Sequence, residues 1–253
     1  METPVRTRLA TLILAYAALT GMTGAADAAG TGPALQPYQA QYHLHSSGFR
    51  AAEITSTLRR DGADYIFETR GKSRGLATLF VPRQAIEVSR FRVGEDGLIA
   101  LSYRRDAGKD DPRDDTRAEF DWENSTVATV DKGRDATLDL TPGMIERHIL
   151  PLAISLGLRR GAAPQSLTLV ERDRVKSFAI TEQGRDRIEL EGVDYETLKF
   201  LQHRDESDRR TTIWFAPDLG FVPVKFEIHD KRGLRARILL QHLTFNAATD
   251  PGG

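Results

Sequence analysis

Two histidines near the start of the chain, His43 and His45, have the spacing that best fits a chemical site. They lie two positions apart in a segment that alternates polar and apolar residues, and side chains two apart leave the same face of a β-strand. Two imidazoles on one face can share a metal ion, but a zinc site needs further ligands and the sequence nominates none. Exposed polar alternation explains the pair, so we predict no metal site and no cofactor.

The other candidate groups also have simple explanations. His148 recurs on the apolar side of a helical pattern, where we expect a hydrogen-bonded core histidine. Asp110-Asp111 and Asp114-Asp115 belong to a charged loop, where solvation accounts for them and the EF-hand spacing is absent. Motifs for a nucleophile elbow, a zinc protease, a P-loop or a dinucleotide fold are missing. We therefore predict no catalytic residues.

An enzyme nevertheless stays an alternative, because a triad assembled from distant residues leaves no local trace in a sequence. The alternative is a hydrolase of envelope polymers. His43, His45 and His148 would be its candidate histidines.

Charge and cysteine content exclude several classes of protein. The formal net charge is -1 and arginine is interleaved with aspartate, so nothing favours a nucleic-acid partner. The arginine pairs Arg104-Arg105 and Arg209-Arg210 are interpreted as solvated faces. The chain has no cysteine, which rules out a disulfide, a thiolate nucleophile and a lipidated cysteine.

The first residues have the three parts of a secretory signal peptide. Arg6 and Arg8 precede the apolar run 9–19, and small residues follow as far as Ala26-Asp27-Ala28. The run is shorter than the roughly 17 to 25 residues of a membrane-spanning helix. We predict cleavage after Ala28, a periplasmic location and no membrane span in the mature protein.

The region 211–230 predicts a β-hairpin with one apolar face. β-formers around Trp214 are followed by the turn residues Pro217, Asp218 and Gly220, and then by a clean alternation. A loop over 216–220 would set Trp214 opposite Val222 and bring the indole to the apolar face.

Similar short strands are expected along most of the chain, with turns that include Gln183-Gly184; the run 76–81 fits a strand or a helical turn equally well. One segment changes period. Thr141 and Pro142 predict the start of a helix, and Pro151 should kink it. Its apolar and histidine positions at helical spacing are Met144, Ile145, His148, Ile149 and Leu152.

We therefore predict a mainly β protein with a strongly curved antiparallel sheet, or open half-barrel, of about a dozen strands wrapped around one central, Pro-kinked helix. Residues 29–37 would form a flexible leader, 38–246 a single domain and 247–253 a disordered tail.

The chain also resembles a known family. Its opening, with Tyr38, Tyr42 and Gly48, and its hairpin motif near the end are similar to exported bacterial proteins of the DUF3108 type, a domain of unknown function. The matching hairpin positions are Trp214, Pro217, Asp218, Pro223, Val224 and Lys225. The resemblance implies a distant likeness to periplasmic lipoprotein carriers of the LolA and LolB type, in which a curved sheet wraps a helix and leaves an apolar concavity.

One helix is expected to leave part of such a sheet's apolar face uncovered. The leading hypothesis is a periplasmic, monomeric binding or carrier protein with an apolar cleft for a lipid or another hydrophobic molecule. Its expected lining is Trp214, Phe226, Met144, Ile145 and Ile149. An alternative is an envelope structural or assembly partner that binds protein through a sheet edge or the loop 106–115.

Overall fold

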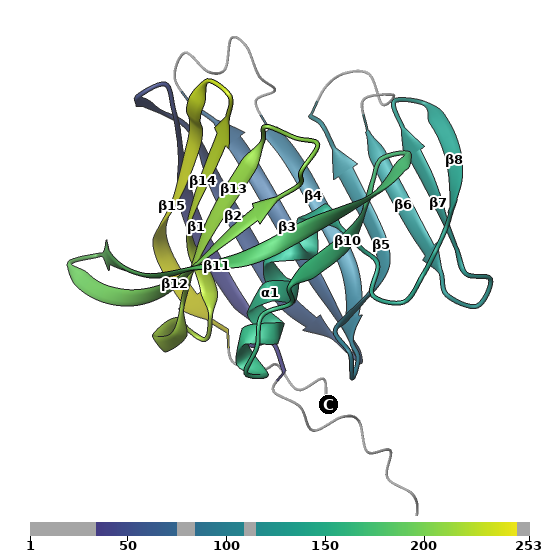
Figure 1. The fold of residues 1–253 in the computed structure, drawn as a ribbon, viewed down its shortest axis with the longest axis horizontal. Helices are drawn as coiled ribbons and strands as arrows, with labels where there is room; N and C mark the ends of the chain where they lie inside the picture. Colours follow the sequence, from purple (N-terminus) through teal and green to yellow (C-terminus); the bar gives the residue numbers. More distant parts are fainter. Residues whose placement is uncertain (1–33, 75–83, 109–114, 247–253) are drawn as a thin grey trace, which may run out of the picture.

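The computed structural model describes residues 34–74, 84–108 and 115–246, which form one 15-stranded sheet around a short helix (Figure 1). The first half of the chain contributes β1 (Tyr38–Ser46), β2 (Phe49–Asp61), β3 (Asp64–Ser73), β4 (Gln84–Val93), β5 (Leu98–Asp106), β6 (Thr116–Asp121), β7 (Thr126–Asp131) and β8 (Arg134–Asp139). The second half contributes β9 (Ile145–Glu146), the 3-10 turn η3 (Arg147–Ile149), α1 (Leu150–Arg159), β10 (Ser166–Glu171), β11 (Arg174–Leu190), β12 (Val193–His203), β13 (Arg210–Ala216), the 3-10 turn η4 (Pro217–Leu219), β14 (Val222–Asp230) and β15 (Gly233–Phe245).

The sheet consists of two meanders joined at the chain ends. Strands β1 to β8 follow one another across one half, β15 to β9 follow one another across the other, and β1 pairs antiparallel with β15 at the join. Only the β9–β10 pair is parallel among the described strands. Strands β8 and β9 are the two edges, although they are neighbours in sequence. The mainly β architecture that the sequence predicted is therefore confirmed.

Alternation of side chains explains why the sheet curves around a core. In β1, Tyr38, Ala40 and Tyr42 are buried whereas Gln39 and Gln41 are exposed, as the sequence predicted. The structure has fifteen strands where about a dozen were expected, and one of them, β9, has only two residues and lies in the segment expected to be helical.

The predicted helix is shorter and begins later than expected. Met144 to Ile149 are not α-helical, because Ile145 and Glu146 pair with Leu169 and Val170 of β10. This strand pairing overrides the local helical period. Pro151 lies in the first turn of α1, where the missing amide costs no hydrogen bond, so it starts the helix rather than kinking it.

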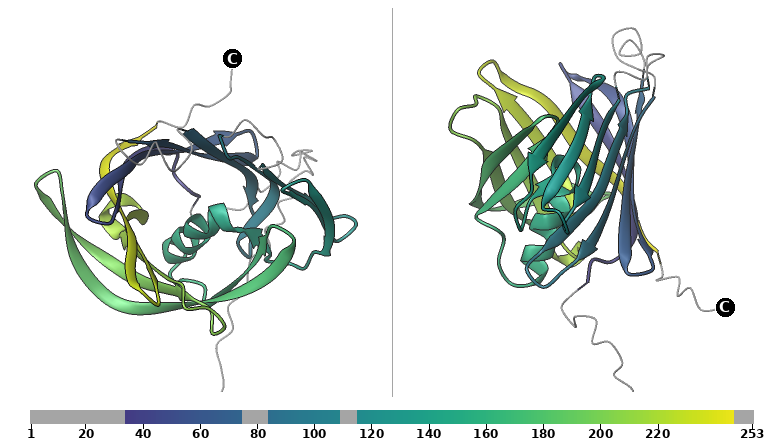
Figure 2. Two further views of the ribbon diagram at one scale, coloured as in Figure 1. Left: turned by 90° about the horizontal axis from the view of Figure 1, so that it is seen from above. Right: turned by 90° about the vertical axis from the view of Figure 1, so that its right-hand side faces the viewer.

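Helix α1 lies inside the curve of the sheet (Figure 2). Hydrogen bonds from the middle and the C-terminal end of the helix reach both meanders. The Ser155 hydroxyl donates to the carbonyl oxygen of Phe221, beside η4. The Arg160 guanidinium donates to the carbonyl oxygens of Gly94 and Glu95, in the β4–β5 turn, at 2.8 and 2.6 Å. The helix therefore ties the two meanders together across the interior.

Two details of the strands differ from the prediction. Gln183-Gly184 is not a turn; it lies in a bulge inside the 17-residue strand β11, where Gly184 has a φ of +91°. The predicted turn at Gln183-Gly184 is therefore wrong, because a bulge accommodates an extra residue without reversing the chain. The run 76–81 lies outside the described residues.

The predicted hairpin 211–230 is present as β13, η4 and β14, but its register is different. Trp214 pairs with Lys225 instead of Val222, because the five-residue loop is shifted by one position to 217–221 and a bulge follows Trp214. A register change of this kind moves a side chain to the other face of the sheet. Trp214 consequently lies opposite to the face that carries Ile213 and Phe226.

Candidate ligand-binding site

An apolar cavity of about 1050 Å³ lies between the β4–β5 hairpin, α1 and β10. Aliphatic and aromatic side chains form most of its wall, and charged residues such as Arg92, Asp96 and Arg160 stand among the lining. The apolar members are Leu98, Ile99, Leu101, Trp122, Pro142, Ile145, Ala153, Leu156, Ala162, Pro164 and Leu167. A cavity of this size and lining is typical of sites for small apolar ligands.

The wall of this cavity is held in place by the surrounding fold. Leu156 is fully buried on α1, and Ile145 is fixed by the pairing of β9 with β10. The indole nitrogen of Trp122 donates to the carbonyl oxygen of Ala100 at 2.7 Å, so its polar atom is satisfied and its ring faces the cavity as an apolar surface.

A second cavity, of about 590 Å³, lies on the other side of β9 and is lined mainly by charged residues. Ile145 lines the apolar cavity, and Glu146, the next residue of β9, lines the polar one. The charged lining is Glu87, Glu146, Glu171, Arg105, Arg117, Arg147, Arg172, Lys176 and Arg209. A strand of two residues thus divides two chemically different spaces.

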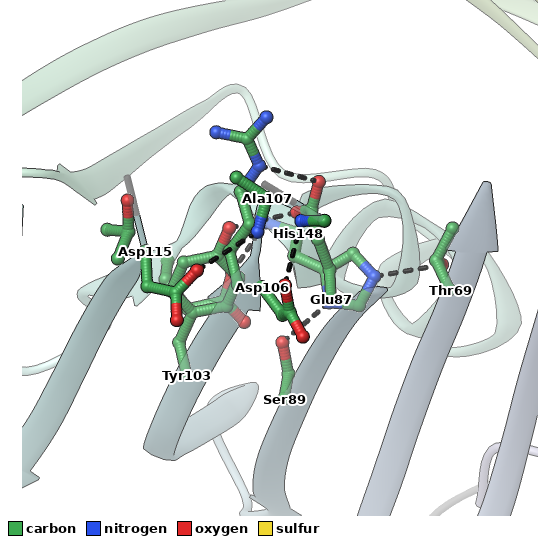
Figure 3. A network of polar contacts seen from close by, with 12 residues as sticks. Thr69, Glu87, Ser89, Tyr103, Asp106, Ala107, Asp115 and His148 are labelled. Carbon is green, nitrogen blue, oxygen red and sulfur yellow. Dashed lines mark hydrogen bonds and ion pairs between the residues drawn. The ribbon is translucent and has the colours of Figure 1, made fainter. Parts of the chain in front are cut away.

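His148 is the centre of a hydrogen-bonded network beside the polar cavity (Figure 3). Its Nδ1 is 2.7 Å from the Ser89 hydroxyl, and its Nε2 is 2.9 Å from the Thr69 hydroxyl. The ring stacks on Phe67, with 4.6 Å between centroids. Burial lowers the pKa of His148 to about 3, so the imidazole is neutral at physiological pH.

Glu146 is buried beside this histidine, with 2% of its surface exposed. Its Oε2 accepts from the backbone amide of His148, and its carboxyl group is hydrogen-bonded to Ser89. Its Oε1 is buried without a hydrogen-bond partner in the described part of the chain. Burial raises the pKa of Glu146 to about 7, because desolvation outweighs these hydrogen bonds.

Tyr103 and Glu87 form a further pair on the wall of the polar cavity. The Tyr103 hydroxyl donates to Glu87 Oε2 at 2.9 Å. Burial and the negative charge of Glu87 raise the pKa of the Tyr103 phenol well above its ordinary range. The phenol therefore stays protonated and acts as a hydrogen-bond donor.

Comparison with known proteins identifies the family but not an activity. Residues 38–239 match the DUF3108 family, described as a protein of unknown function. The chain belongs to the DUF3108 family. No curated protein is recognisably similar to it in sequence.

Solved structures that are similar to this chain have low sequence identity to it. A β-barrel-like protein of the domain of unknown function DUF1849 from Brucella abortus has a TM-score of 0.54 and 13% identity, with 84% of this chain and 98% of that chain covered. This likeness shows the fold alone. A candidate lipoprotein from Parabacteroides distasonis has a TM-score of 0.33 and 11% identity, with 84% and 97% covered. A candidate exported protein with a YmcC-like fold from Bacteroides fragilis has a TM-score of 0.32 and 8% identity, with 84% and 98% covered.

The Ser89, His148 and Glu146 side chains of this DUF3108 protein do not form a hydrolytic triad. In such a triad the histidine bridges the nucleophile and the carboxylate. Here Ser89 lies between His148 and Glu146, and Thr69 occupies the other imidazole nitrogen. Ser89 is also fully buried, which denies a substrate access to its hydroxyl. The geometry fits the hydrogen-bonded core histidine that the sequence predicted.

The five residues expected to line an apolar cleft lie in different places in the DUF3108 fold. Ile145 lines the apolar cavity. Met144 and Ile149 are buried in the core, and Phe226 packs edge-on against Tyr42 at 6.3 Å; none of these three lines the described apolar cavity. Whether a ligand binds any of them stays a prediction.

Trp214 is buried on the opposite face of the sheet from Phe226. The ammonium groups of Lys199 and Lys225 lie 5.4 and 4.1 Å from its ring centroid. Its indole nitrogen donates to Asp186 at 3.1 Å. The indole is therefore enclosed by polar side chains, away from the apolar cavity.

The other histidine candidates are not brought together. The rings of His43 and His45 lie 6.3 Å apart, and His43 Nε2 is 3.2 Å from Arg50. No group of three side chains suited to a metal ion occurs in residues 34–74, 84–108 and 115–246. None of the helices in these ranges is long and apolar enough to cross a membrane.

Apart from Ile145 and His148, the residues that line the two cavities were not predicted as site residues. Leu98, Leu101 and Trp122 lie in strand-like segments, and nothing local in the sequence shows that they face one space. Glu146 could have been noticed as the one carboxylate in the segment 144–150, where Arg147 and His148 follow it between apolar residues. A charged residue there is unusual unless it is paired or shares a polar site.

Proposed function

We propose that the protein is an exported binding protein that holds an apolar molecule, such as a lipid chain, in the cavity between α1, β10 and the β4–β5 hairpin. The observation that carries the proposal is the apolar cavity of about 1050 Å³ with a wall fixed by the fold. Its apolar lining includes Ile145, Leu101, Ala153 and Leu156. Burial of apolar ligand surface against such a wall provides the main favourable free energy.

The proposed location is the periplasm, after cleavage behind Ala28. Its support is the basic, apolar and small-residue pattern of the first 28 residues. An apolar carrier is useful in this compartment, because lipids must cross an aqueous space between membranes. The alternative of a protein partner bound through the loop 106–115 rests largely on residues 109–114, which lie outside the described ranges.

The direct test is binding of an environment-sensitive apolar dye, N-phenyl-1-naphthylamine, to the purified exported protein, with oleic acid as competitor. Ala153→Trp inserts an indole into the cavity from α1. We expect dye affinity to fall about fivefold or more, since about 1 kcal/mol of apolar burial is lost. Mass spectrometry of the organic extract should also find lipid in the wild type and less in this variant.

The matched control is Ala128→Trp, which adds the same side chain at an exposed position of β7 that lines none of the described cavities. It should leave dye affinity within about twofold of the wild type. Equal affinity of both variants for the dye, or displacement of no dye by oleic acid, would show that the cavity is not the binding site.

A further inference from the structure

Four basic side chains and one carboxylate line a small cavity that shares part of its wall with the polar cavity. The basic cluster consists of Arg147 of η3, Lys176 of β11, and Arg204 and Arg209 from the segment between β12 and β13. They line the smaller cavity, of about 160 Å³, together with Glu171, Phe178, Gln202, Ser207 and Thr211.

Glu171 neutralises only part of this charge. It accepts hydrogen bonds from Arg147 and, at 2.7 Å, from Lys176. Burial raises the pKa of Glu171, but these two cations outweigh burial and hold the pKa below its ordinary value, so the carboxylate is ionised. One negative charge therefore faces four positive charges in the lining.

The remaining cations lack an internal partner of comparable strength. Arg209 has no carboxylate within ion-pair distance in the described residues. Lost solvation and then the positive charge of Arg147 lower the pKa of Arg209, and the negative charges of Glu171 and Asp230 only partly oppose this shift. Arg204 pairs only with the highly exposed Glu206, whose carboxylate lies 3.5 Å from the buried Arg204 Nε without forming a hydrogen bond among the described residues. Positive charge is thus concentrated beyond what the protein itself compensates.

Phe178 orients two of these guanidinium groups. The Arg147 and Arg204 guanidinium carbons lie 5.7 and 5.8 Å from the centroid of its ring. Stacking on one aromatic ring restricts both side chains, which lowers the entropic cost of binding a ligand between them. The cluster is therefore held in place without an ion in the site.

We propose that this cavity binds a phosphate-type oxyanion, presented either as a free ion or as the head group of a phospholipid. Arginine forms paired, charge-assisted hydrogen bonds with tetrahedral oxyanions, and Lys176 adds a further charge. The amide of Gln202 and the hydroxyls of Ser207 and Thr211 supply neutral donors in the same lining. The inference goes beyond the apolar cavity, with which this site shares no lining residue.

This interpretation changes the role of one arginine pair. Arg209-Arg210 was predicted to be a solvated face, and a neighbouring pair of arginines alone does not distinguish a solvated face from an anion site. The fold gives the two arginines different positions, because Arg209 lines the cavity beside Arg147 and Lys176 whereas Arg210 does not line it.

The test is isothermal titration of the exported protein with inorganic phosphate at low ionic strength, and in parallel with soluble dihexanoyl phosphatidic acid. Arg209→Gln should weaken phosphate binding about tenfold, since one charge-assisted contact is lost. Glu171→Gln should strengthen it by a similar factor, because the competing carboxylate becomes neutral. Arg134→Gln, an exposed arginine of β8 outside every described cavity, is the control and should leave the affinity within twofold.

Opposite effects of the two cluster variants would support the site, since a general loss of structure weakens binding in both. Binding of phosphatidic acid with the same pattern identifies a head group as a ligand, and binding of phosphate alone identifies a free solute. The proposal is overturned if neither phosphate nor phosphatidic acid binds. It is also overturned if Arg209→Gln and Glu171→Gln both leave the affinity unchanged. Dye binding to the apolar cavity is measured on separate variants, so either proposal can fail while the other holds.

Discussion

The two sides of strand β9 border chemically different cavities. Ile145 lines the large apolar cavity, and the adjacent Glu146 lines the cavity with charged walls. The apolar wall can border an empty cavity because its atoms need no hydrogen bonds. The polar wall must satisfy almost every buried donor and acceptor, and it does so through Ser89, His148 and Thr69.

This difference indicates where each side gains its stability and what each can bind. On the apolar side, stability comes from the close packing of α1, and the uncovered remainder is available to an apolar ligand. On the polar side, stability depends on protonation states and hydrogen bonds, and the uncompensated charge favours an anion. Three predictions test this contrast.

The largest expected effect concerns packing. Leu152 is fully buried on α1, and Leu152→Ala should lower the free energy of unfolding by about 2–5 kcal/mol, because it leaves a cavity in a filled region. Leu167→Ala is the matched variant on the cavity side, where the half-buried leucine already borders empty space. It should cost less than about 1.5 kcal/mol, as less packing is lost. Urea denaturation measures both, and equal costs would contradict the distinction between a filled and an unfilled side.

The second prediction concerns pH and the polar side. Glu146 has a pKa of about 7 in the folded protein against an ordinary 4.5, so the folded state retains its proton longer than the unfolded state. Its contribution therefore falls as pH rises from 4.5 to 7. His148 has a folded pKa of about 3 against an ordinary 6.5, so the unfolded state takes up the proton first. Its contribution therefore falls as pH decreases from 6.5 to 3.

Between pH 4.5 and 6.5 these two contributions to the free energy of unfolding change in opposite directions in the wild type. Glu146→Gln should remove the contribution that falls with pH, and His148→Phe the contribution that rises with pH. Relative to wild type, the unfolding free energy of Glu146→Gln should rise with pH across this window, and that of His148→Phe should fall, each by about 1 kcal/mol per pH unit. Urea denaturation at several pH values gives the two difference curves. Parallel or flat curves would show that these groups do not titrate as their burial requires.

Much of the fold could be predicted from sequence, because alternation is a local signal. The strands around Tyr38, Phe120 and Ile86 have the alternation of polar and apolar residues that is typical of strands, and the family resemblance is confirmed. The helix start could not be predicted in the same way. The segment Met144 to Ile149 has helical spacing, and only its pairing with β10, more than twenty residues away, makes part of it a strand.

The cavities were harder to predict than the strands for a related reason. A cavity is a property of several elements at once, and Leu98, Trp122 and Leu167 come from three distant segments. The register of one hairpin also mattered. The bulge after Trp214 moved the indole to the other face, and a bulge leaves little trace in the pattern of a single strand.

The smallest expected effect separates the two tryptophans, Trp122 and Trp214, which lie in the two kinds of environment. Trp122 lines the apolar cavity, so its fluorescence should change when an apolar ligand binds. Trp214 is enclosed by Lys199, Lys225 and Asp186 and should not respond. Trp122→Phe should therefore abolish the oleic-acid-induced change in tryptophan emission, whereas Trp214→Phe should retain it and leave dye affinity within twofold. Trp214→Phe should still destabilise the protein by about 1 kcal/mol, because Asp186 loses its indole donor. If the ligand-induced change in emission disappears in Trp214→Phe instead, the bound molecule lies on the other face of the sheet. The residues that the register of the β13–β14 hairpin brings to that face, rather than the cavity beside α1, would then form the binding site.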